Sequence, residues 1–270
     1  TAAFEPVLDY VIAKLPRFPF DKFATAPNTL GTQMKATGEV MSIGSNLEEC
    51  FLKAVRSLET GADHYQIPKF VNMETADILE YIKEFKDDNI FCITELIRRG
   101  VSVKKIHEIT MITEYFIDAV KNIVDMENKL KKNIGDIDIL KSAKKIGFSD
   151  KFIAKLWNKS EIEIFNLRKE NKIMPVYRMV DTCHTNAYIP YFYSTYQGKN
   201  ESALSNKKKI IVLGAGPIRI GQGVEFDYST VHAVTTIKNS GYEAIIINNN
   251  PETVSTDYTC SDKLYFEPLT

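Results

Sequence analysis

Two short apolar runs near the end of the chain constrain its fold more than any other feature. Residues 209–214 (KIIVLG) and residues 244–248 (AIIIN) each predict a buried strand, and residues 228–240 between them predict a helix. Continuous apolar runs joined through a helix are typical of neighbouring parallel strands that are covered on both faces. The sequence therefore predicts a strand–helix–strand unit of the α/β class in this region.

The middle of the chain has a different pattern. From residue 62 to about residue 175, apolar side chains recur at helical spacing nearly throughout. Ser149 and Ser160 are placed to act as N-caps of short helices. The expected helices cover residues 75–85, 91–99, 103–111, 113–130, 136–146, 149–157 and 160–170. These short, closely connected helices predict a compact all-α module with little visible catalytic chemistry.

The first 44 residues are expected to form extended structure interrupted by prolines, with strands over residues 10–15 and 39–44. Ser45 and Glu48 have the spacing of a capping box, in which each side chain satisfies a backbone N–H of the first turn. This predicts a helix up to Leu58, ended by Gly61. Residues 173–205 are expected to form an irregular connector over a surface, with a flexible linker from Gln197 to Lys209.

Composition indicates a balanced globular protein. The 270 residues contain 34 Lys plus Arg and 35 Asp plus Glu, and the net charge of -1 argues against a dedicated nucleic-acid binder. Without eighteen consecutive apolar residues, a membrane span is not expected. The length fits two domains, or a piece of something larger. The cysteines are far apart and predict free thiols in a reducing, cytoplasmic setting: Cys50, Cys92, Cys183 and Cys260.

Glycines follow the first of the two apolar strands, where a dinucleotide-binding fingerprint would lie. Gly214 and Gly216 fit that motif, but Arg219 stands at its third position, and Gly221 and Gly223 come too late. Asparagines at 248–250 replace the acidic residue that would bind a ribose. A nicotinamide or flavin cofactor is therefore disfavoured. The glycines predict a tight turn, and a small ligand at the strand ends stays open.

Three carboxylates are expected beyond the same strand ends. Glu225 and Asp227 follow the glycines, and Glu252 follows the second strand. Carboxylates gathered at a crevice bind polar substrates or transfer protons. Asp227 has an equally good alternative role as the cap of the helix that starts near Tyr228. Both interpretations stay open on the sequence alone.

The histidines give no sign of a metal site. His184 adjoins Cys183, but no second His or Cys lies at ligand spacing, so a satisfied loop histidine is favoured. His232 is expected to face the sheet and pack there. His64 and His107 carry no pattern, and no metal ligands are predicted.

The residues around the glycines identify a family. Residues 217–228 (PIRIGQGVEFDY), followed by residues 250–258 (NPETVSTDY), closely resemble the start of the second synthetase half of the carbamoyl phosphate synthetase large subunit. The resemblance extends along the chain in the same order. Segments near the N-terminus are similar to the end of that family's first ATP-grasp domain: 16–18, 33–35 and 38–41. Two later segments resemble the exit from its helical oligomerisation domain: 180–183 and 193–196.

This resemblance implies a multi-domain fold that is mainly α in the middle. Residues 1–61 would be the C-terminal α+β end of the first ATP-grasp (carboxyphosphate) domain. Residues 62–204 would be the all-α oligomerisation domain. Residues 205–270 would be the α/β, Rossmann-like pre-ATP-grasp start of the second synthetic domain. One departure is visible, because His184-Thr185-Asn186 stands where the family usually has small residues and an acidic–aromatic pair.

The activity that the resemblance implies is ATP-dependent ligation. The family makes carbamoyl phosphate, for arginine or pyrimidine synthesis, from bicarbonate, ammonia from a glutaminase small subunit, and two ATP with Mg or Mn. Its unstable intermediates pass through an internal tunnel, whose wall positions correspond here to Gly223, Glu225 and Glu252. Catalytic, nucleotide and metal residues are expected to lie outside this span, which would therefore be inactive alone. The helical module implies other copies of the large subunit as partners, with no nucleic acid and no membrane.

Two rival interpretations come from other classes of protein. An autonomous helical self-association module without a catalytic role accounts for the middle of the chain equally well. A nucleotide-binding regulatory domain is disfavoured by the broken fingerprint.

Overall fold

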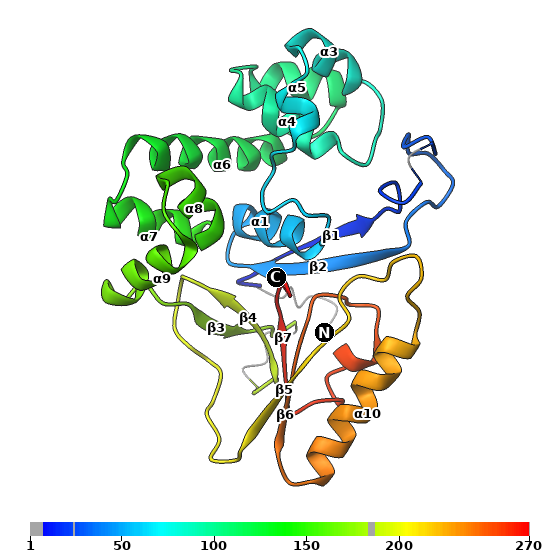
Figure 1. The fold of residues 1–270 in the computed structure, drawn as a ribbon, viewed down its shortest axis with the longest axis vertical. Coiled ribbons are helices and arrows are strands. Elements are labelled where there is room, and N and C mark those ends of the chain that lie inside the picture. The colour runs from blue at the N-terminus through cyan, green and yellow to red at the C-terminus, as the bar shows by residue number, and fades with distance from the viewer. Residues whose placement is uncertain (1–7, 24, 183–186, 270) are drawn as a thin grey trace, which may run out of the picture. The chain divides into compact units, whose positions relative to one another are not determined.

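The computed structural model describes residues 8–23, 25–182 and 187–269 and divides the chain into two compact units (Figure 1). The sheet unit consists of the described residues up to Arg17, residues 37–59 and the described residues from Ile173 onward. The helical unit consists of the described residues among 18–36 and residues 60–172. Both units are therefore built from segments that are far apart in the sequence.

The sheet unit begins with an antiparallel pair of strands, β1 (Val11–Arg17) and β2 (Gly38–Gly44), which confirms both predicted N-terminal strands. Helix α1 (Leu47–Ser57) follows, but its cap lies one residue later than predicted. The Asn46 side chain accepts the N–H of Glu49, and Glu49 in turn accepts the N–H of Ser45. The predicted pair of Ser45 and Glu48 is wrong because Asn46 and Glu49 have the same spacing and make these bonds.

The second sheet has five strands in the order β3-β4-β7-β6-β5. They are β3 (Val176–Met179), β4 (Tyr191–Thr195), β5 (Lys209–Leu213), β6 (Glu243–Asn248) and β7 (Lys263–Phe266). All neighbours are parallel except β3 and β4. Helix α10 (Glu225–Asn239) joins β5 to β6, and a short 3-10 helix, η1 (Val254–Thr256), lies between β6 and β7 (Figure 1). The predicted strand–helix–strand unit is confirmed.

The irregular connector predicted for residues 173–205 is wrong in two places. Its aromatic run forms β4, in which Phe192 and Tyr193 are fully buried, and β3 pairs beside it. The sequence of this run does not indicate a strand, because the strands that pair with it, β3 and β7, are separated from it in the sequence. Residues 183–186, with the Cys183 thiol and the departing His184 segment, lie outside the described residues.

Strand β5 is not buried as its apolar sequence predicts. It is the edge strand, and Ile210, Ile211 and Leu213 are exposed, whereas β6 beside it is almost wholly buried. The apolar core of the sheet unit instead lies between the centre of the five-stranded sheet, α10 and the β1–β2 pair. Its buried members are Tyr10, Ile43, Val180, Tyr193, Val234, Ala244, Ile246, Leu264 and Phe266.

The helical unit confirms the predicted all-α pattern. Its described helices are α2 (Pro68–Val71), α3 (Thr75–Tyr81), α4 (Asn89–Arg98), α5 (Val103–Thr110), α6 (Glu114–Lys132), α7 (Ile137–Lys145), α8 (Asp150–Trp157) and α9 (Glu161–Glu170). Ser149 caps α8, and Ser160 forms a capping box with Glu163 at α9, so both predicted N-caps are confirmed.

The chain is thus α-rich in the middle and contains sheets on both sides of that middle in the sequence. The assignment of residues 1–61, 62–204 and 205–270 to three domains stays a prediction. No helix in the described residues combines the length and apolarity needed to cross a bilayer. Cys50 and Cys92 are buried free thiols, as predicted, and burial raises the pKa of each to about 12.

Candidate functional site

The carboxyl ends of β5 and β6 meet at one cavity. Because these strands are adjacent and parallel, the loops that follow them lie at the same edge of the sheet. A cavity of about 100 Å³ lies there. Its wall includes Gly216 and Gly223 from the first loop, Asp227 from α10, and Asn250 and Glu252 from the second loop. Residues predicted separately from two loops are therefore brought together.

The glycines shape the first loop in different ways. A Cβ on Gly214 would come within 2.4 Å of the Asn248 side chain, so only glycine fits this close approach. Gly216 has a φ of +68° and Gly221 a φ of +87°, in the left-handed region that favours glycine. At Gly221 the space around a Cβ would be open, so conformation alone is the constraint there.

Two asparagines hold the glycine loop in place. The Asn248 side-chain oxygen accepts the N–H of Gly216 at 3.2 Å, and the Asn250 side-chain amide donates to the Gly216 carbonyl at 3.1 Å. Both asparagines are buried. The residues that stand in place of the ribose-binding carboxylate therefore brace the loop itself.

Glu225 lies beside the cavity. It is the first residue of α10, which begins three residues earlier than predicted, and its Oε1 accepts the N–H of Gly223 at 3.2 Å. A Cβ on Gly223 would meet the Glu225 Oε2 at 2.5 Å. The position of the Glu225 carboxylate therefore depends on residue 223 having no side chain.

Asp227 does not cap α10, because it lies inside that helix. Its buried carboxylate instead accepts the N–H groups of Val254 at 2.9 Å and Ser255 at 3.1 Å, in the first turn of η1. Asp227 therefore lies in the wall of the cavity and also caps a helix, but the helix that it caps is η1 and not α10. It fixes the end of the loop that carries Glu252.

Glu252 is held by residues that the sequence did not indicate. The Lys14 Nζ lies 2.5 Å from the Glu39 Oε1 and 3.3 Å from the Glu252 Oε1, so this lysine of β1 bridges β2 and the loop after β6. A hydrogen bond with Glu39, followed by the hydrogen bond and charge of Lys14, lowers the pKa of Glu252. No local signal could have found Lys14 or Glu39, since they lie more than 200 residues before Glu252.

A second ion pair anchors the other loop. Arg219, the residue that breaks the dinucleotide fingerprint, pairs with Glu59, which lies just after α1. The N-terminal segments of the sheet unit thus support both loops of the cavity.

The histidine predictions had mixed outcomes. His232 does not pack against the sheet: it is exposed on α10, and its ring lies 4.2 Å from that of Tyr228. Successive residues of a helix point to different faces. Lying between Val231 and Val234 in the sequence therefore did not place the His232 side chain on the sheet-facing side of α10. Within the described residues, no group of three His, Cys, Asp or Glu side chains is placed to hold a metal ion.

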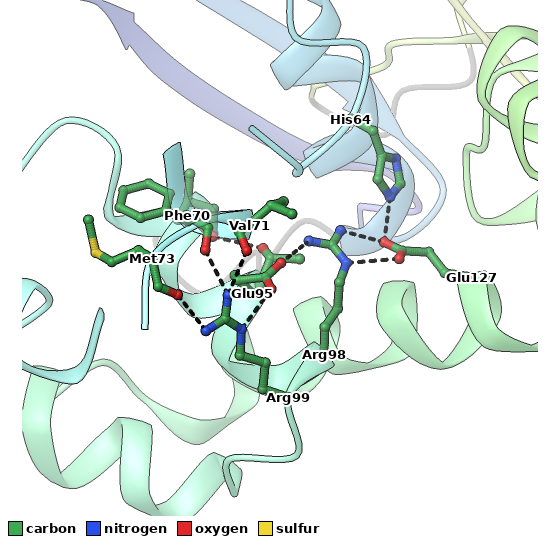
Figure 2. A network of polar contacts seen from close by, with 10 residues as sticks. His64, Phe70, Val71, Met73, Glu95, Arg98, Arg99 and Glu127 are labelled. Atoms are coloured by element: carbon green, nitrogen blue, oxygen red, sulfur yellow. Dashed lines mark hydrogen bonds and ion pairs between the residues drawn. The ribbon is translucent and has the colours of Figure 1, made fainter. Parts of the chain in front are cut away.

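A separate charged cluster is buried in the helical unit (Figure 2). Glu127 of α6 accepts hydrogen bonds from the Arg98 Nε at 2.9 Å and Nη2 at 2.7 Å, and its Oε1 lies 2.7 Å from the His64 Nε2. The His64 ring stacks on Phe152 of α8, with ring centroids 3.7 Å apart. The segment before α2 is thereby joined to α4, α6 and α8.

Arg99 extends this cluster to the turn between α2 and α3 (Figure 2). Its guanidinium donates to the carbonyl groups of Phe70 at 2.8 Å, Val71 at 3.1 Å and Met73 at 2.7 Å, and to the carboxylate of Glu95 at 2.8 Å. These carbonyls lie at and just after the end of α2, where the last carbonyls of a helix need partners from outside it. The Phe70 carbonyl also accepts the N–H of Met73 at 3.3 Å. The two adjacent arginines therefore stabilise the helical packing, and the cluster is a structural one.

Burial by itself would raise the pKa of Glu127. Hydrogen bonds from Arg98 and His64, together with their charges, outweigh burial and lower its pKa to about 2. The carboxylate is therefore ionised over the whole range in which most proteins are folded.

Two protein-family models match this chain. Residues 39–172 match the oligomerisation domain of the carbamoyl-phosphate synthetase large chain. Residues 206–270 match the preATP-grasp domain of carbamoyl phosphate synthase. The first match covers β2, α1 and the helices α2 to α9, and the second covers the strands and loops that form the cavity. Two successive matches to one large chain agree with the resemblance of the motifs, and the chain belongs to the carbamoyl-phosphate synthetase large-chain family.

Proposed function

We propose that this chain is part of the large chain of a glutamine-dependent carbamoyl phosphate synthetase, and that its cavity at the ends of β5 and β6 is one wall of the passage for intermediates. The observation that carries the proposal is the convergence of Gly223 and Glu252, from two loops, and Asp227, from α10, on that cavity. The family matches support the ligase chemistry, in which bicarbonate, ammonia and two ATP give carbamoyl phosphate.

The chemistry of the cavity wall fits an unstable, polar intermediate. Gly223 leaves space where any side chain would displace the Glu225 carboxylate. Glu252 offers oxygen acceptors, but carboxylates alone would repel an anion such as carbamate. Lys14 offsets one of the two negative charges of Glu252 and Glu39. In this proposal Lys14, Glu39 and Glu252 together keep the passage polar without making it strongly negative.

The remaining components are assigned to other parts of the enzyme. The backbone N–H and carbonyl of Gly216 in the glycine loop already bond to Asn248 and Asn250. ATP and its Mg or Mn ions would therefore be bound by residues outside this span. Ammonia would come from a glutaminase small subunit. The oligomerisation domain supports self-association through the helical unit.

Filling the passage is expected to separate the partial reactions from the overall reaction. In a large chain with both synthetic halves, Gly223→Leu places a side chain in a cavity of only about 100 Å³. We expect bicarbonate-dependent ATP hydrolysis to persist and carbamoyl phosphate formation to fall by about 100-fold or more, equivalent to about 3 kcal/mol. Both rates are measured in the same preparation.

A matched control is Ile220→Phe, which enlarges an exposed side chain of the same loop. It should leave the ratio of the two rates unchanged. If Gly223→Leu also leaves that ratio unchanged, the cavity is not part of a passage.

This polypeptide alone is expected to show no bicarbonate-dependent ATPase activity. Among its described residues, the carboxylates at the cavity are held by backbone amides or Lys14, and none is arranged as a metal cluster. The measurement is phosphate release with and without bicarbonate. Turnover would refute the assignment of nucleotide chemistry to other residues. An inactive parent protein that nevertheless self-associates would favour the alternative, a helical module without a catalytic role.

A further inference from the structure

The turn between α5 and α6 presents a compact apolar patch, defined here as Met111, Tyr115 and Phe116. Their side chains are 75%, 66% and 46% exposed, although they lie within six residues of one another. The rings of Tyr115 and Phe116 pack edge to face, with centroids 5.4 Å apart. Single exposed apolar side chains are ordinary, but adjoining aromatic ones mark contact surfaces.

The backbone conformation of Met111 is a second, independent observation that singles out this patch. Met111 has a φ of +58°, in the left-handed region where glycine is favoured and a side chain is strained. A helix normally ends there with glycine or asparagine. A large apolar side chain stands at this position instead, and it is three-quarters exposed, so its burial offsets little of the strain.

The turn is also held rigidly. The N–H of Met111 donates to the His107 carbonyl at 2.8 Å, and the His107 ring Nδ1–H donates to the Ile112 carbonyl at 2.7 Å. The Thr110 hydroxyl accepts the N–H of Ile112 at 3.2 Å. A patch on a fixed turn binds a partner without first losing conformational freedom.

We propose that this patch is the centre of a contact between two copies of this chain. The inference rests on the self-association proposed above, and it names the surface. The matched model for residues 39–172 is that of an oligomerisation domain, which makes a second copy the occupant to test. A two-fold contact applies the same patch from each copy, so Met111, Tyr115 and Phe116 would face their own counterparts.

The surrounding charges suit such a contact. Exposed Lys104, Lys105 and Glu108 lie on α5, and exposed Glu114 and Asp118 lie on α6. In a two-fold contact a rim residue of one copy meets a different residue of the other, so the two lysines of α5 can face the acidic residues of α6. An apolar centre with a polar rim of both signs is the usual anatomy of an interface.

The size of the patch sets the expected strength. The exposed parts of its three side chains amount to roughly 400 Å² per copy. Two copies with their rims would bury on the order of 1,200 Å², the lower limit for stable interfaces. The contact is therefore weak, with a dissociation constant in the micromolar range.

The test is sedimentation velocity of the whole chain at increasing concentration, for the wild type and matched variants. Tyr115→Glu puts an acidic residue in the first turn of α6, which a helix tolerates well, and should raise the dissociation constant at least about tenfold. Ile162→Glu is the control, since Ile162 is also the second residue of a helix, α9, and is 60% exposed. Ile162→Glu should leave the dissociation constant unchanged.

A second variant has two effects of opposite sign. Met111→Gly relieves the backbone strain, so the midpoint of thermal unfolding should rise by about 2 to 4 °C. It also removes part of the patch, so association should weaken. Unchanged association in both Tyr115→Glu and Met111→Gly, with a wild type that dimerises, would overturn the assignment of the surface. A wild type that stays monomeric throughout would instead overturn the self-association on which it rests.

Discussion

Replacing Glu127 with glutamine is expected to lower the free energy of unfolding of the helical unit by about 3 to 5 kcal/mol. The substitution removes the charge that compensates Arg98 and His64, which hydrogen-bond to Glu127 in a buried site. Arg98 would keep only the Glu95 carboxylate, whose Oε2 lies 3.4 Å from its Nη1, in place of the shorter charged bonds to Glu127. Loss of charge compensation in a buried site is far more costly than the loss of one surface contact. Because these residues join α4 and α6 to the segment before α2, the whole unit should unfold more easily.

The single tryptophan makes this effect measurable. Trp157 lies in α8, and its indole N–H donates to the Leu130 carbonyl of α6 at 2.9 Å, so its fluorescence reports on the helical unit. Urea unfolding followed by this signal should shift to lower denaturant with the same slope. Asp118→Asn, an exposed change on the same helix, should stay within about 0.5 kcal/mol of the wild type. Equal midpoints for both variants would contradict the prediction.

The same residue gives the wild type a pH dependence of known sign. Hydrogen bonds and charge from Arg98 and His64 outweigh burial and lower the pKa of Glu127 to about 2 in the folded chain, from the ordinary value of 4.5. Its ionisation therefore stabilises the fold fully above about pH 4.5, and this contribution is lost as the pH falls towards 2. The contribution is about 3 kcal/mol. The stability difference between the wild type and Glu127→Gln should accordingly shrink as the pH is lowered from 5 to 2.

Gly214→Ala is the second change with a large expected effect, in the sheet unit. A Cβ there would lie 2.4 Å from the Asn248 side chain, which is buried and cannot move without losing bonds. The Asn248 oxygen accepts the N–H groups of Gly216, Asn249 and Asn250. Overpacking with loss of these bonds should lower stability by about 2 to 4 kcal/mol.

Amide hydrogen exchange measured on peptides from β5 and β6 tests this without relying on the tryptophan. Protection should fall by about 30-fold or more, the equivalent of about 2 kcal/mol. Gly221→Ala is the control, because its Cβ would enter open space and only its positive φ opposes the change. That control should lose about 1 kcal/mol. Equal protection in both variants would show that Asn248 moves aside freely.

Features with a local cause were predictable. The helices of the helical unit follow from apolar spacing, and Ser149 and Ser160 cap the helices they precede, because a cap needs only the next three residues. Even the error at α1 was local, since Asn46 and Glu49 compete with Ser45 and Glu48 for the same bonds. The glycine loop and the carboxylates beyond it were likewise placed correctly at the strand ends.

Features with a distant cause were not predictable. Strand β5 has the apolar sequence of a central strand, yet it lies at the edge, because strand order is decided by which segments pair. The Tyr191–Thr195 run became β4 only through pairing with β3 and β7. Asp227 had a plausible cap role on its own helix, but its actual partners, Val254 and Ser255, come from beyond the next strand.

By itself, the sequence determined the helices of the helical unit, the strand–helix–strand unit, the resemblance to the synthetase family and the edge of the sheet at which glycines and carboxylates gather. Those properties depend on residues that are close together in the chain. The tertiary structure alone decided that Lys14 and Glu39 hold Glu252, that Arg219 pairs with Glu59, and that Arg98 and His64 share the Glu127 carboxylate. Charged side chains can pair with any partner of opposite sign, so their choice is made by packing, which brings one of many possible partners within reach.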